Sequence, residues 1–407
     1  MTERGRLALG LGAATYIAAW AFGSRPLYPV ATGLLLAVAI AAVWIGLARK
    51  PMRLGRHLRG GEHLEGDDLR IDLDLEVEGS VPLPAVVLVE ELGKLGKRAT
   101  PMRSNGRRLY ADYQLWSVPR GRYPYRQARA VLEDPFGLCR AEVDLGAGGA
   151  LLVYPRLVDL DRVFSDAGSQ TPDGRRVLLR RPSGFDLHSV REYEQGESLR
   201  KVHWRSTAKR GQLMVKELED APRDEIAVVL DADASAVAGT PPDSSFDMQV
   251  RAAGSILKAH VRRGRRSVLV VSSALAESQR VHSSDGDWRA ALELLAAVEP
   301  TASVPLGTIL SADESAASRA LELTVVTARL APDLVDRLVH RSLARHGAAL
   351  VYVDAPSFAN GVDRRRPPPE PALLRLQAAG VSIAVLRRGD DLSAALGRAV
   401  PAGAASG

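Results

Sequence analysis

Three oxygen-bearing side chains stand at alternate positions near the middle of the chain. Asp231, Asp233 and Ser235 come directly after the mainly apolar run 225–230, which reads as a buried strand. Ligands of open α/β sheets bind beyond the carboxyl ends of strands, and a hard divalent cation prefers oxygen ligands. The pattern is therefore compatible with a site for a divalent cation such as Mg²⁺. The alternative is that the two aspartates cap the next helix or hydrogen-bond within the loop.

Other common chemistries find little support in the sequence. No Gly-x-Ser-x-Gly nucleophile elbow is present. His188 and His203 lie fifteen residues apart without further ligand spacing, which argues against a zinc site. The single cysteine, Cys139, excludes an internal disulfide and a cysteine-based zinc site. The run 93–97 has two residues between its glycines and no Ser or Thr after its last lysine, so it is not a phosphate loop.

Residues 183–220 combine balanced charge with large aromatic rings. Seven Lys or Arg residues stand against seven Asp or Glu residues in this stretch. A solvated charge run would carry one sign and would lack rings such as Tyr193 and Trp204. Rings of this size normally need partial burial. We therefore expect a packed, ion-paired module in which both rings are partly buried.

The same stretch carries a spaced set of residue types. The positions are Arg191, Glu192, Tyr193, Gly196, Glu197, Arg200, His203, Trp204 and Thr207, followed by Ala208 and residues 215–217. Together they resemble the signature of the DUF58 family, a domain of unknown function in bacterial membrane proteins. Glu197 stands where the family usually has Asp, which keeps the charge and lengthens the reach. The resemblance implies that the signature residues form a structural or docking surface.

The resemblance also implies a von Willebrand factor A-like domain after the signature, and such domains bind protein partners. Asp231, Asp233 and Ser235 are similar to the metal-ion-dependent adhesion site of these domains, Asp-x-Ser-x-Ser, with Asp233 in place of the first Ser. That site also needs a Thr and an Asp from later loops. Thr308 is the candidate Thr, but Thr327 stands where the later Asp is expected. The predicted metal site is therefore degenerate.

Two apolar segments begin the chain. Residues 7–23 and 27–48 carry no charge, and a membrane-spanning helix needs about 20 such residues. A short turn at 24–26 joins them, which predicts a two-helix transmembrane hairpin. Basic residues precede the first segment and follow the second, so the positive-inside rule places both ends in the cytoplasm. The alternative, a signal peptide over residues 1–23, conflicts with the second apolar segment.

Residues 60–160 are expected to form an antiparallel β-sandwich. Strict alternation of apolar and charged residues over 69–78 indicates a half-buried strand. Phe136, in a turn, is expected to fill the core. Turn signals separate five further strand-like runs, and we expect a small sandwich of about seven strands. The runs are 85–90, 108–116, 123–132, 140–144 and 151–154.

Short apolar runs alternate with helical patterns over residues 225–390, which predicts a parallel sheet covered on both faces. Residues 161–224 are expected to hold a linker and the signature module, and residues 391–407 a tail. The arginines at 175, 176, 180 and 181 are either solvated or in contact with anionic lipid. The expected fold is thus multidomain, with the hairpin over residues 1–59, the sandwich, the module, the von Willebrand factor A-like α/β domain and the tail.

The formal net charge of +6 resides in the N-terminal segment. Residues 1–60 hold eight basic residues and one acid, and the remainder holds 46 basic and 47 acidic residues. Phosphate binding needs clustered positive charge, so we expect no nucleic-acid partner for the near-neutral remainder.

These features favour a non-enzymatic, multi-pass protein of the cell membrane, with both termini cytoplasmic. We expect an interaction or adaptor role, with Mg²⁺ as the one candidate cofactor. The resemblance implies a MoxR-type AAA+ ATPase as partner and a chaperone-like or envelope-related role. The alternative is a metal-assisted hydrolase that uses the Asp231 cluster.

Overall fold

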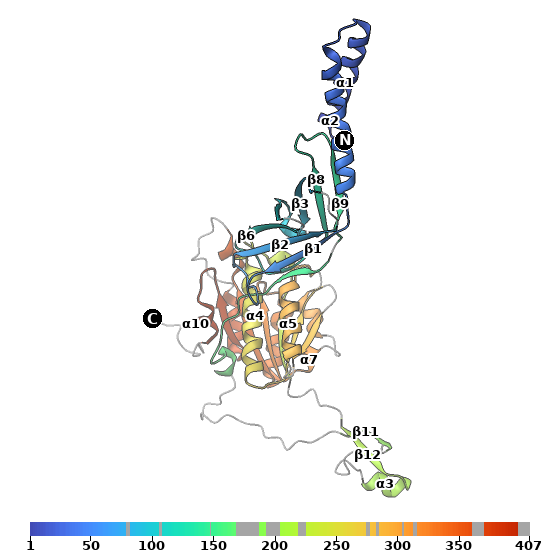
Figure 1. Ribbon diagram of the computed structural model, residues 1–407. Helices are drawn as coiled ribbons and strands as arrows, with labels where there is room; N and C mark the ends of the chain where they lie inside the picture. The colour runs from blue at the N-terminus through green and yellow to red at the C-terminus, as the bar shows by residue number, and fades with distance from the viewer. Residues whose placement is uncertain are drawn as a thin grey trace. The chain divides into compact units, whose positions relative to one another are not determined.

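The computed structural model divides the chain into two compact units, Met1–Tyr154 and Pro155–Gly407 (Figure 1). Each unit has apolar clusters of its own. The structure describes residues 1–78, 82–105, 108–146, 148–167, 187–192, 204–218, 225–273, 277–281, 285–302, 305–311, 316–359 and 370–397.

The first unit begins with two helices, α1 (Glu3–Ala21) and α2 (Leu27–Ala48), which pack against each other. Gly12 permits the close approach, because a Cβ there would lie 3.1 Å from the side chain of Leu35. Among the described helices, α2 alone is long and apolar enough to cross a membrane. Helix α1 is not apolar enough, because basic residues stand at its start. The two-span hairpin therefore stays a prediction.

The sandwich consists of two four-stranded sheets, with strand orders β1-β2-β6-β5 and β4-β3-β8-β9, and a two-stranded ribbon of β7 and β10. All the pairings within these sheets are antiparallel. The strands are β1 (Met52–Leu58), β2 (Leu69–Val77), β3 (Ala85–Glu91), β4 (Lys97–Pro101), β5 (Arg103–Asn105), β6 (Arg108–Leu115), β7 (Gly121–Pro124), β8 (Gln127–Glu133), β9 (Arg140–Asp144) and β10 (Ala150–Val153).

The alternating pattern of β2 was a reliable guide to its structure. Leu69, Ile71, Leu73 and Leu75 are all buried, and the charged residues between them face outward or lie at the margin. The strand prediction is therefore confirmed. Strand β1 corrects the predicted boundary at residue 59, because residues 52–58 pair with β2 along their whole length.

Strand β1 escapes an apolar pattern search because an arginine stands between Leu54 and Leu58 on its inward face. The Arg56 guanidinium lies 2.7 Å from the carboxylate of Glu90, which is 2% exposed. The Tyr113 hydroxyl donates to the same carboxylate at 3.1 Å, and the Tyr125 ring lies 4.4 Å from the guanidinium carbon. Burial and the neighbouring Glu90 raise the pKa of Tyr113, so its hydroxyl stays a donor.

The turn after β8 fastens the start of α1. The Thr2 hydroxyl donates to the carbonyl of Gly137 at 2.6 Å, and the Thr2 N–H donates to the carbonyl of Leu138 at 3.0 Å. Asp134 accepts the N–H of Phe136 within the turn. The Phe136 ring is 75% exposed, so the prediction that it fills the core is wrong.

The last turns of α2 belong to the sandwich core. Ala41, Ile45 and Ala48 are buried in one cluster with Leu75 of β2 and Leu132 of β8. Burial of this apolar area at about 25 cal/mol per Å² favours a fixed junction between helix and sandwich.

The second unit contains a six-stranded sheet of order β15-β14-β13-β16-β17-β18. Five strands are parallel, and β15 joins the edge antiparallel to β14. The strands are β13 (Ile226–Leu230), β14 (Ser267–Val271), β15 (Ser278–Val281), β16 (Glu322–Thr327), β17 (Gly347–Val353) and β18 (Ser382–Leu386). The predicted strands of the parallel sheet are confirmed, and β15 is an addition.

The described helices after residue 225 are α4 (Ser245–Arg262), α5 (Asp285–Ala297), α6 (Leu306–Ser311), α7 (Ala316–Arg319), α8 (Pro332–Leu343), α9 (Glu370–Ala378) and α10 (Leu392–Gly397). Helix α10 lies within residues 391–407, which the sequence assigned to a tail, and its Leu392 and Leu396 are buried in the core.

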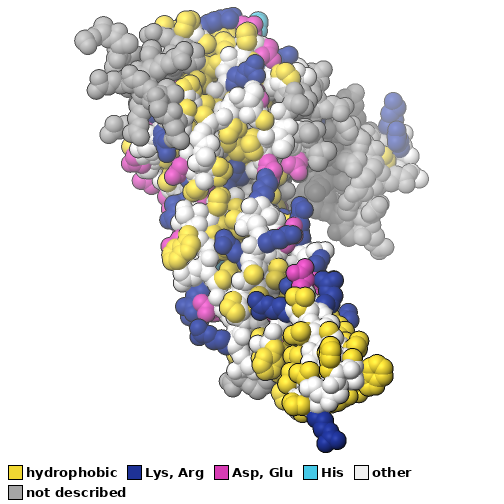
Figure 2. Space-filling model, turned by 90° about the horizontal axis from the view of Figure 1, so that it is seen from above, with side chains coloured by type: hydrophobic (Ala, Val, Ile, Leu, Met, Phe, Trp, Pro, Cys, Tyr) yellow, Lys and Arg dark blue, Asp and Glu magenta, His cyan; other side chains and the backbone are white. Residues whose placement is uncertain are grey.

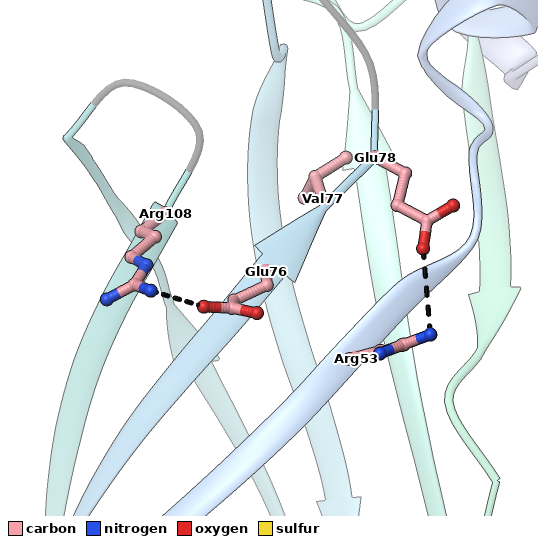
Figure 3. Close-up of a pocket in the computed structure, with 5 residues that line it drawn as sticks. All are labelled: Arg53, Glu76, Val77, Glu78 and Arg108. Atoms are coloured by element: carbon pink, nitrogen blue, oxygen red, sulfur yellow. Dashed lines mark ion pairs between the residues drawn. The ribbon is translucent and has the colours of Figure 1, made fainter.

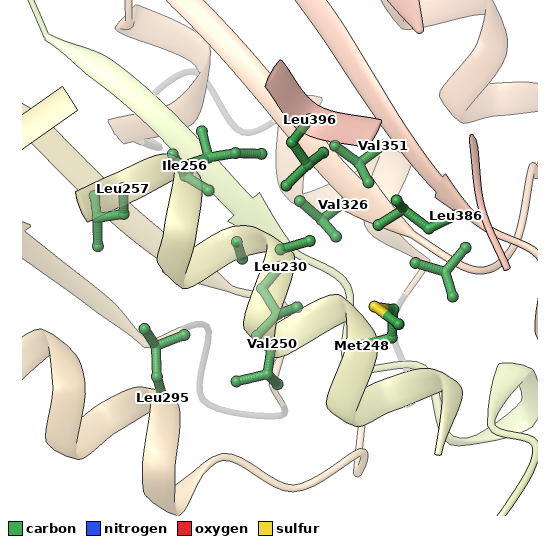
Figure 4. Packing of buried hydrophobic residues seen from close by; sticks show 14 of the residues in the cluster. Leu230, Met248, Val250, Ile256, Leu257, Leu295, Val326, Val351, Leu386 and Leu396 are labelled. Atoms are coloured by element: carbon green, nitrogen blue, oxygen red, sulfur yellow. The ribbon is translucent and has the colours of Figure 1, made fainter. Parts of the chain in front are cut away.

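Side chains on both faces of the sheet are buried. Within β13, Val228 and Leu230 join the cluster under α4, while Ala227 and Val229 join the cluster that contains α8 residues. Figure 4 shows Leu230 beside Val250 and Val326 in the first cluster. Because both faces of these strands are buried, their sequences are continuous apolar runs.

Candidate functional site

Three neighbouring strands end at the same edge of the sheet and bring distant residues together. In the register, Leu230 of β13 pairs with Val271 of β14 and with Val326 of β16. Asp231 therefore follows β13 at the level where Ser272 follows β14 and where Thr327 ends β16. From β13 the chain adds β14 and β15 on one side of the sheet, and it then adds β16, β17 and β18 on the other side. Ligands of such sheets usually bind at the point where the strand order reverses, here between β13 and β16.

Asp231 is buried, and its carboxylate accepts three hydrogen bonds from protein groups. Its Oδ2 accepts the Thr327 hydroxyl at 2.6 Å, and its Oδ1 accepts the Ser272 hydroxyl at 3.1 Å and the Asp233 N–H at 3.2 Å. Burial raises the pKa of Asp231, although the hydrogen bonds from Thr327 and Ser272 oppose that shift. The carboxylate thus organises the loop from inside.

A second, outer cluster adjoins the buried carboxylate. Arg329 Nη1 lies 3.1 Å from Asp233 Oδ2 and 3.1 Å from Ser235 Oγ. Asp233 Oδ1 accepts the Ser235 N–H at 2.8 Å and so caps the short 3₁₀ turn Ala234–Ala236. Partial burial alone would raise the pKa of Asp233, but the hydrogen bonds from Ser235 and the Arg329 guanidinium lower it overall.

The structure gives Thr308 a place apart from these contacts. It lies exposed on α6, where its N–H donates to the Pro305 carbonyl and its own carbonyl accepts the Ser311 hydroxyl. Within the described ranges, no group of three or more His, Cys, Asp or Glu residues is placed to hold a metal ion. The capping alternative describes Asp233 correctly, while Mg²⁺ binding stays an untested prediction.

The sequence reasoning missed Ser272, Thr327 as a partner of Asp231, and Arg329. Each follows or ends a strand that the apolar pattern predicts, so a search of strand ends for polar residues would have found them. Their contact with Asp231 or Asp233 depends on strand order, which the pattern alone does not give.

The signature region forms a small antiparallel pair with a helix. Strand β11 (Leu187–Glu192) pairs with β12 (Met214–Leu218), and α3 (Trp204–Arg210) precedes β12. Arg191 and Glu192 lie in β11, opposite Val215 and Met214.

One hydrogen bond ties the helix to the strand. The Thr207 hydroxyl accepts the Met214 N–H at 3.0 Å, and the Met214 side chain is buried. Trp204 is 67% exposed, so the prediction of a partly buried ring is wrong for this residue. The remaining signature residues lie outside the described part: Tyr193, Gly196, Glu197, Arg200 and His203.

The sandwich carries a shallow hollow at the ends of β1, β2 and β6. It encloses about 260 Å³ and is lined by Arg53, Glu76, Val77, Glu78 and Arg108. Figure 3 shows each glutamate facing its own arginine: Glu76 and Arg108 are 2.6 Å apart, and Glu78 and Arg53 are 3.9 Å apart. This internal pairing makes the hollow a weak candidate for a ligand site.

Comparison with known proteins agrees with the signature. Residues 189–356 match the family model of DUF58, a protein of unknown function. The matched residues include the β11–β12 pair and the sheet strands from β13 to β17. The chain is also 22% identical over 280 residues to the "uncharacterized protein YeaD" of Bacillus subtilis (strain 168), covering 66% of this chain and 68% of that protein.

Solved structures add little to this comparison. The bacterial hydrophobin BslA is 12% identical and aligns with 24% of this chain and 98% of its own, with a TM-score of 0.16. Cwp6 from Clostridium difficile is 7% identical over 74% of this chain and 49% of its own, with a TM-score of 0.21. Scores this low establish no shared fold.

Proposed function

We propose that this DUF58-type chain is a membrane-anchored interaction protein that works with a MoxR-type AAA+ ATPase in a chaperone-like or envelope-related role. Two spans would anchor it, with both termini and all domains after residue 60 in the cytoplasm. The ATPase partner comes from the family resemblance, and the anchor comes from the surface of α1 and α2.

The exposed apolar surface of the helix pair carries the proposal. More than half of the large hydrophobic side chains that are exposed in the described residues lie in α1, α2 and their ends, including Leu7, Ile17, Trp20 and Phe22. Hydrophobic side chains gather over these helices in Figure 2. A monomer in water rarely exposes so large an apolar patch, whereas lipid would cover it.

The distribution of charge supports the orientation. Arg4 and Arg6 begin α1, and Arg49 and Lys50 follow α2, whereas the turn between the helices holds Arg25. The bonds from Thr2 to Leu138 and the burial of Ala48 in the sandwich core hold both ends beside the same domain. The positive-inside rule then favours a cytoplasmic sandwich.

The strand order supports the von Willebrand factor A-like interpretation of the second unit. Numbered within the sheet, the order is 3-2-1-4-5-6 with the third strand antiparallel. This doubly wound arrangement offers the edge beyond β13 and β16 for recognition. A partner that binds there would contact the Asp233, Ser235 and Arg329 cluster.

Cysteine labelling tests the anchor. In a Cys139→Ser background, Ser24→Cys places a thiol in the turn between the helices and Ser393→Cys places one in α10. We expect a membrane-impermeant maleimide to label the first in intact cells and the second only after permeabilisation. Labelling of both, or recovery of the protein in the soluble fraction, would contradict the anchored topology.

A further inference from the structure

The oxygen atoms that a metal ion would need are already engaged by the protein. Both oxygens of the Asp231 carboxylate accept hydrogen bonds from inside the fold, and the residue is 6% exposed. Mg²⁺ requires near-octahedral oxygen coordination with several waters. Three hydrogen bonds leave the buried Asp231 carboxylate only about one of its four acceptor sites for a metal ion. The residues present therefore do not fit a Mg²⁺ site of the adhesion type.

A guanidinium stands instead beside the outer two oxygens. The same nitrogen of Arg329 lies 3.1 Å from both Asp233 Oδ2 and Ser235 Oγ. These are the two side chains that the sequence pattern offered as ligands beside Asp231. A cation placed between them would meet the positive charge of Arg329 at contact distance, and like charges at that separation repel strongly.

The backbone of Arg329 is fixed by the same hydroxyl that contacts the buried aspartate. The Arg329 N–H donates to Thr327 Oγ1 at 2.9 Å, and Thr327 Oγ1 lies 2.9 Å from the Arg329 carbonyl. Thr327 Oγ1 also lies 2.6 Å from Asp231 Oδ2. These hydrogen bonds fix the backbone of Arg329 at the edge of the sheet. Its side chain is 61% exposed.

We propose that Arg329 is the resident cation of this edge and takes the place of a divalent metal ion, so that recognition there needs no metal. The inference deepens the proposed function, since it concerns how the same edge would work. Positive charge is supplied permanently by the chain and does not depend on the concentration of free metal.

Manganese binding to the full chain in detergent tests the proposal without any partner. Free and bound Mn²⁺ are distinguished by electron paramagnetic resonance for the wild type, Arg329→Gln, the double variant Arg329→Gln/Asp233→Asn and Arg337→Gln. The last removes one exposed arginine from α8 and serves as the charge-matched control. Thermal melting of each variant checks that the fold is kept.

We expect Arg329→Gln to gain one Mn²⁺ site with a Kd of about 10⁻³ M or tighter, relative to the wild type and to Arg337→Gln. The gain should disappear in the double variant. A wild-type site that Arg329→Gln leaves unchanged or weakens would overturn the proposal, and so would the absence of any gain in Arg329→Gln. Because no partner or membrane is needed, these outcomes are independent of whether the proposed function holds.

Discussion

Asp231 is a carboxylate placed where its charge is costly. Burial raises its pKa above the ordinary value of 3.8, so the folded state holds the proton more tightly than the unfolded chain does. The free energy of unfolding therefore falls as pH rises from the ordinary value through the raised one, and it stays lower above it. The contribution that protonated Asp231 makes to stability is lost over that window.

Asp231→Asn should remove this pH dependence. An asparagine Nδ2 can donate to the Thr327 hydroxyl, which can direct its own proton to the Arg329 carbonyl 2.9 Å away. We expect the stability of the variant relative to wild type to rise with pH, by up to about 1.4 kcal/mol per unit within the window. Denaturant unfolding between pH 4 and 8 measures the difference, with the exposed Asp243→Asn as control. Parallel pH profiles for wild type and Asp231→Asn would contradict the argument.

The exposure of Trp204 reverses the expectation drawn from its size. A residue that is 67% exposed should tolerate truncation within about 0.5 kcal/mol. Met214 is 1% exposed in the same module, and Met214→Ala should cost about 2–5 kcal/mol. Hydrogen exchange of β11 and β12 reports this local stability. We expect marked acceleration in Met214→Ala and little change in Trp204→Ala, and equal acceleration in both would show that the ring is packed.

The candidate site was predictable only in part. Asp231, Asp233 and Ser235 could be found because they follow an apolar run within one segment. Thr327 and Arg329 lie almost a hundred residues later, and nothing local links them to Asp231. Only the pairing of β13 with β16 brings them together.

Among the elements, those with an apolar period were predicted and those without one were missed. Strand β2 has alternate buried residues, and β13 is buried throughout. Strand β1 turns Arg56 inward against Glu90, which a search for apolar residues does not recognise. Strand β15 covers a sheet edge and buries fully only Val281, so its sequence is mostly polar.

Two glycines of α1 offer a matched test of how the helix is attached. A Cβ at Gly5 would lie within van der Waals overlap of the Leu138 carbonyl, which is backbone and cannot rotate away. A Cβ at Gly10 would meet nothing within 4 Å. Gly5→Ala should therefore cost about 1–3 kcal/mol through overpacking, and Gly10→Ala should gain up to about 1 kcal/mol from helix propensity.

Melting of the detergent-solubilised chain measures both glycine variants, and protease cleavage in the turn 134–139 locates the effect. We expect earlier cleavage in Gly5→Ala alone, because displacement of α1 would break the bonds from Thr2 to the turn. Opposite shifts in melting temperature would confirm the attachment, and similar shifts would refute it.

For the whole molecule, the distribution of charge separates the segment proposed as an anchor from the unit proposed to bind a partner. The basic excess lies in residues 1–60, where lipid headgroups would meet it, and the remainder is close to neutral. The proposed partner of the second unit would therefore recognise local features and not the long-range electrostatic field of the chain. Two such features are exposed on this unit: the Arg329 guanidinium at the sheet edge and the Trp204 ring on α3.

Capture of the proposed ATPase partner by the full chain in nanodiscs distinguishes these two surfaces. With Mg²⁺ and ATP held constant, so that the nucleotide state of the ATPase does not vary, we compare wild type, Arg329→Glu, Arg337→Glu and Trp204→Ala. Reversing a charge inside an interface costs several kcal/mol, so we expect Arg329→Glu to reduce recovery at least about tenfold and Arg337→Glu to leave it unchanged. Loss in Trp204→Ala with full recovery in Arg329→Glu would move the docking surface to the signature module. Recovery of no ATPase by the wild type would remove the partner from the proposed function, while the manganese titration of Arg329 would keep its meaning.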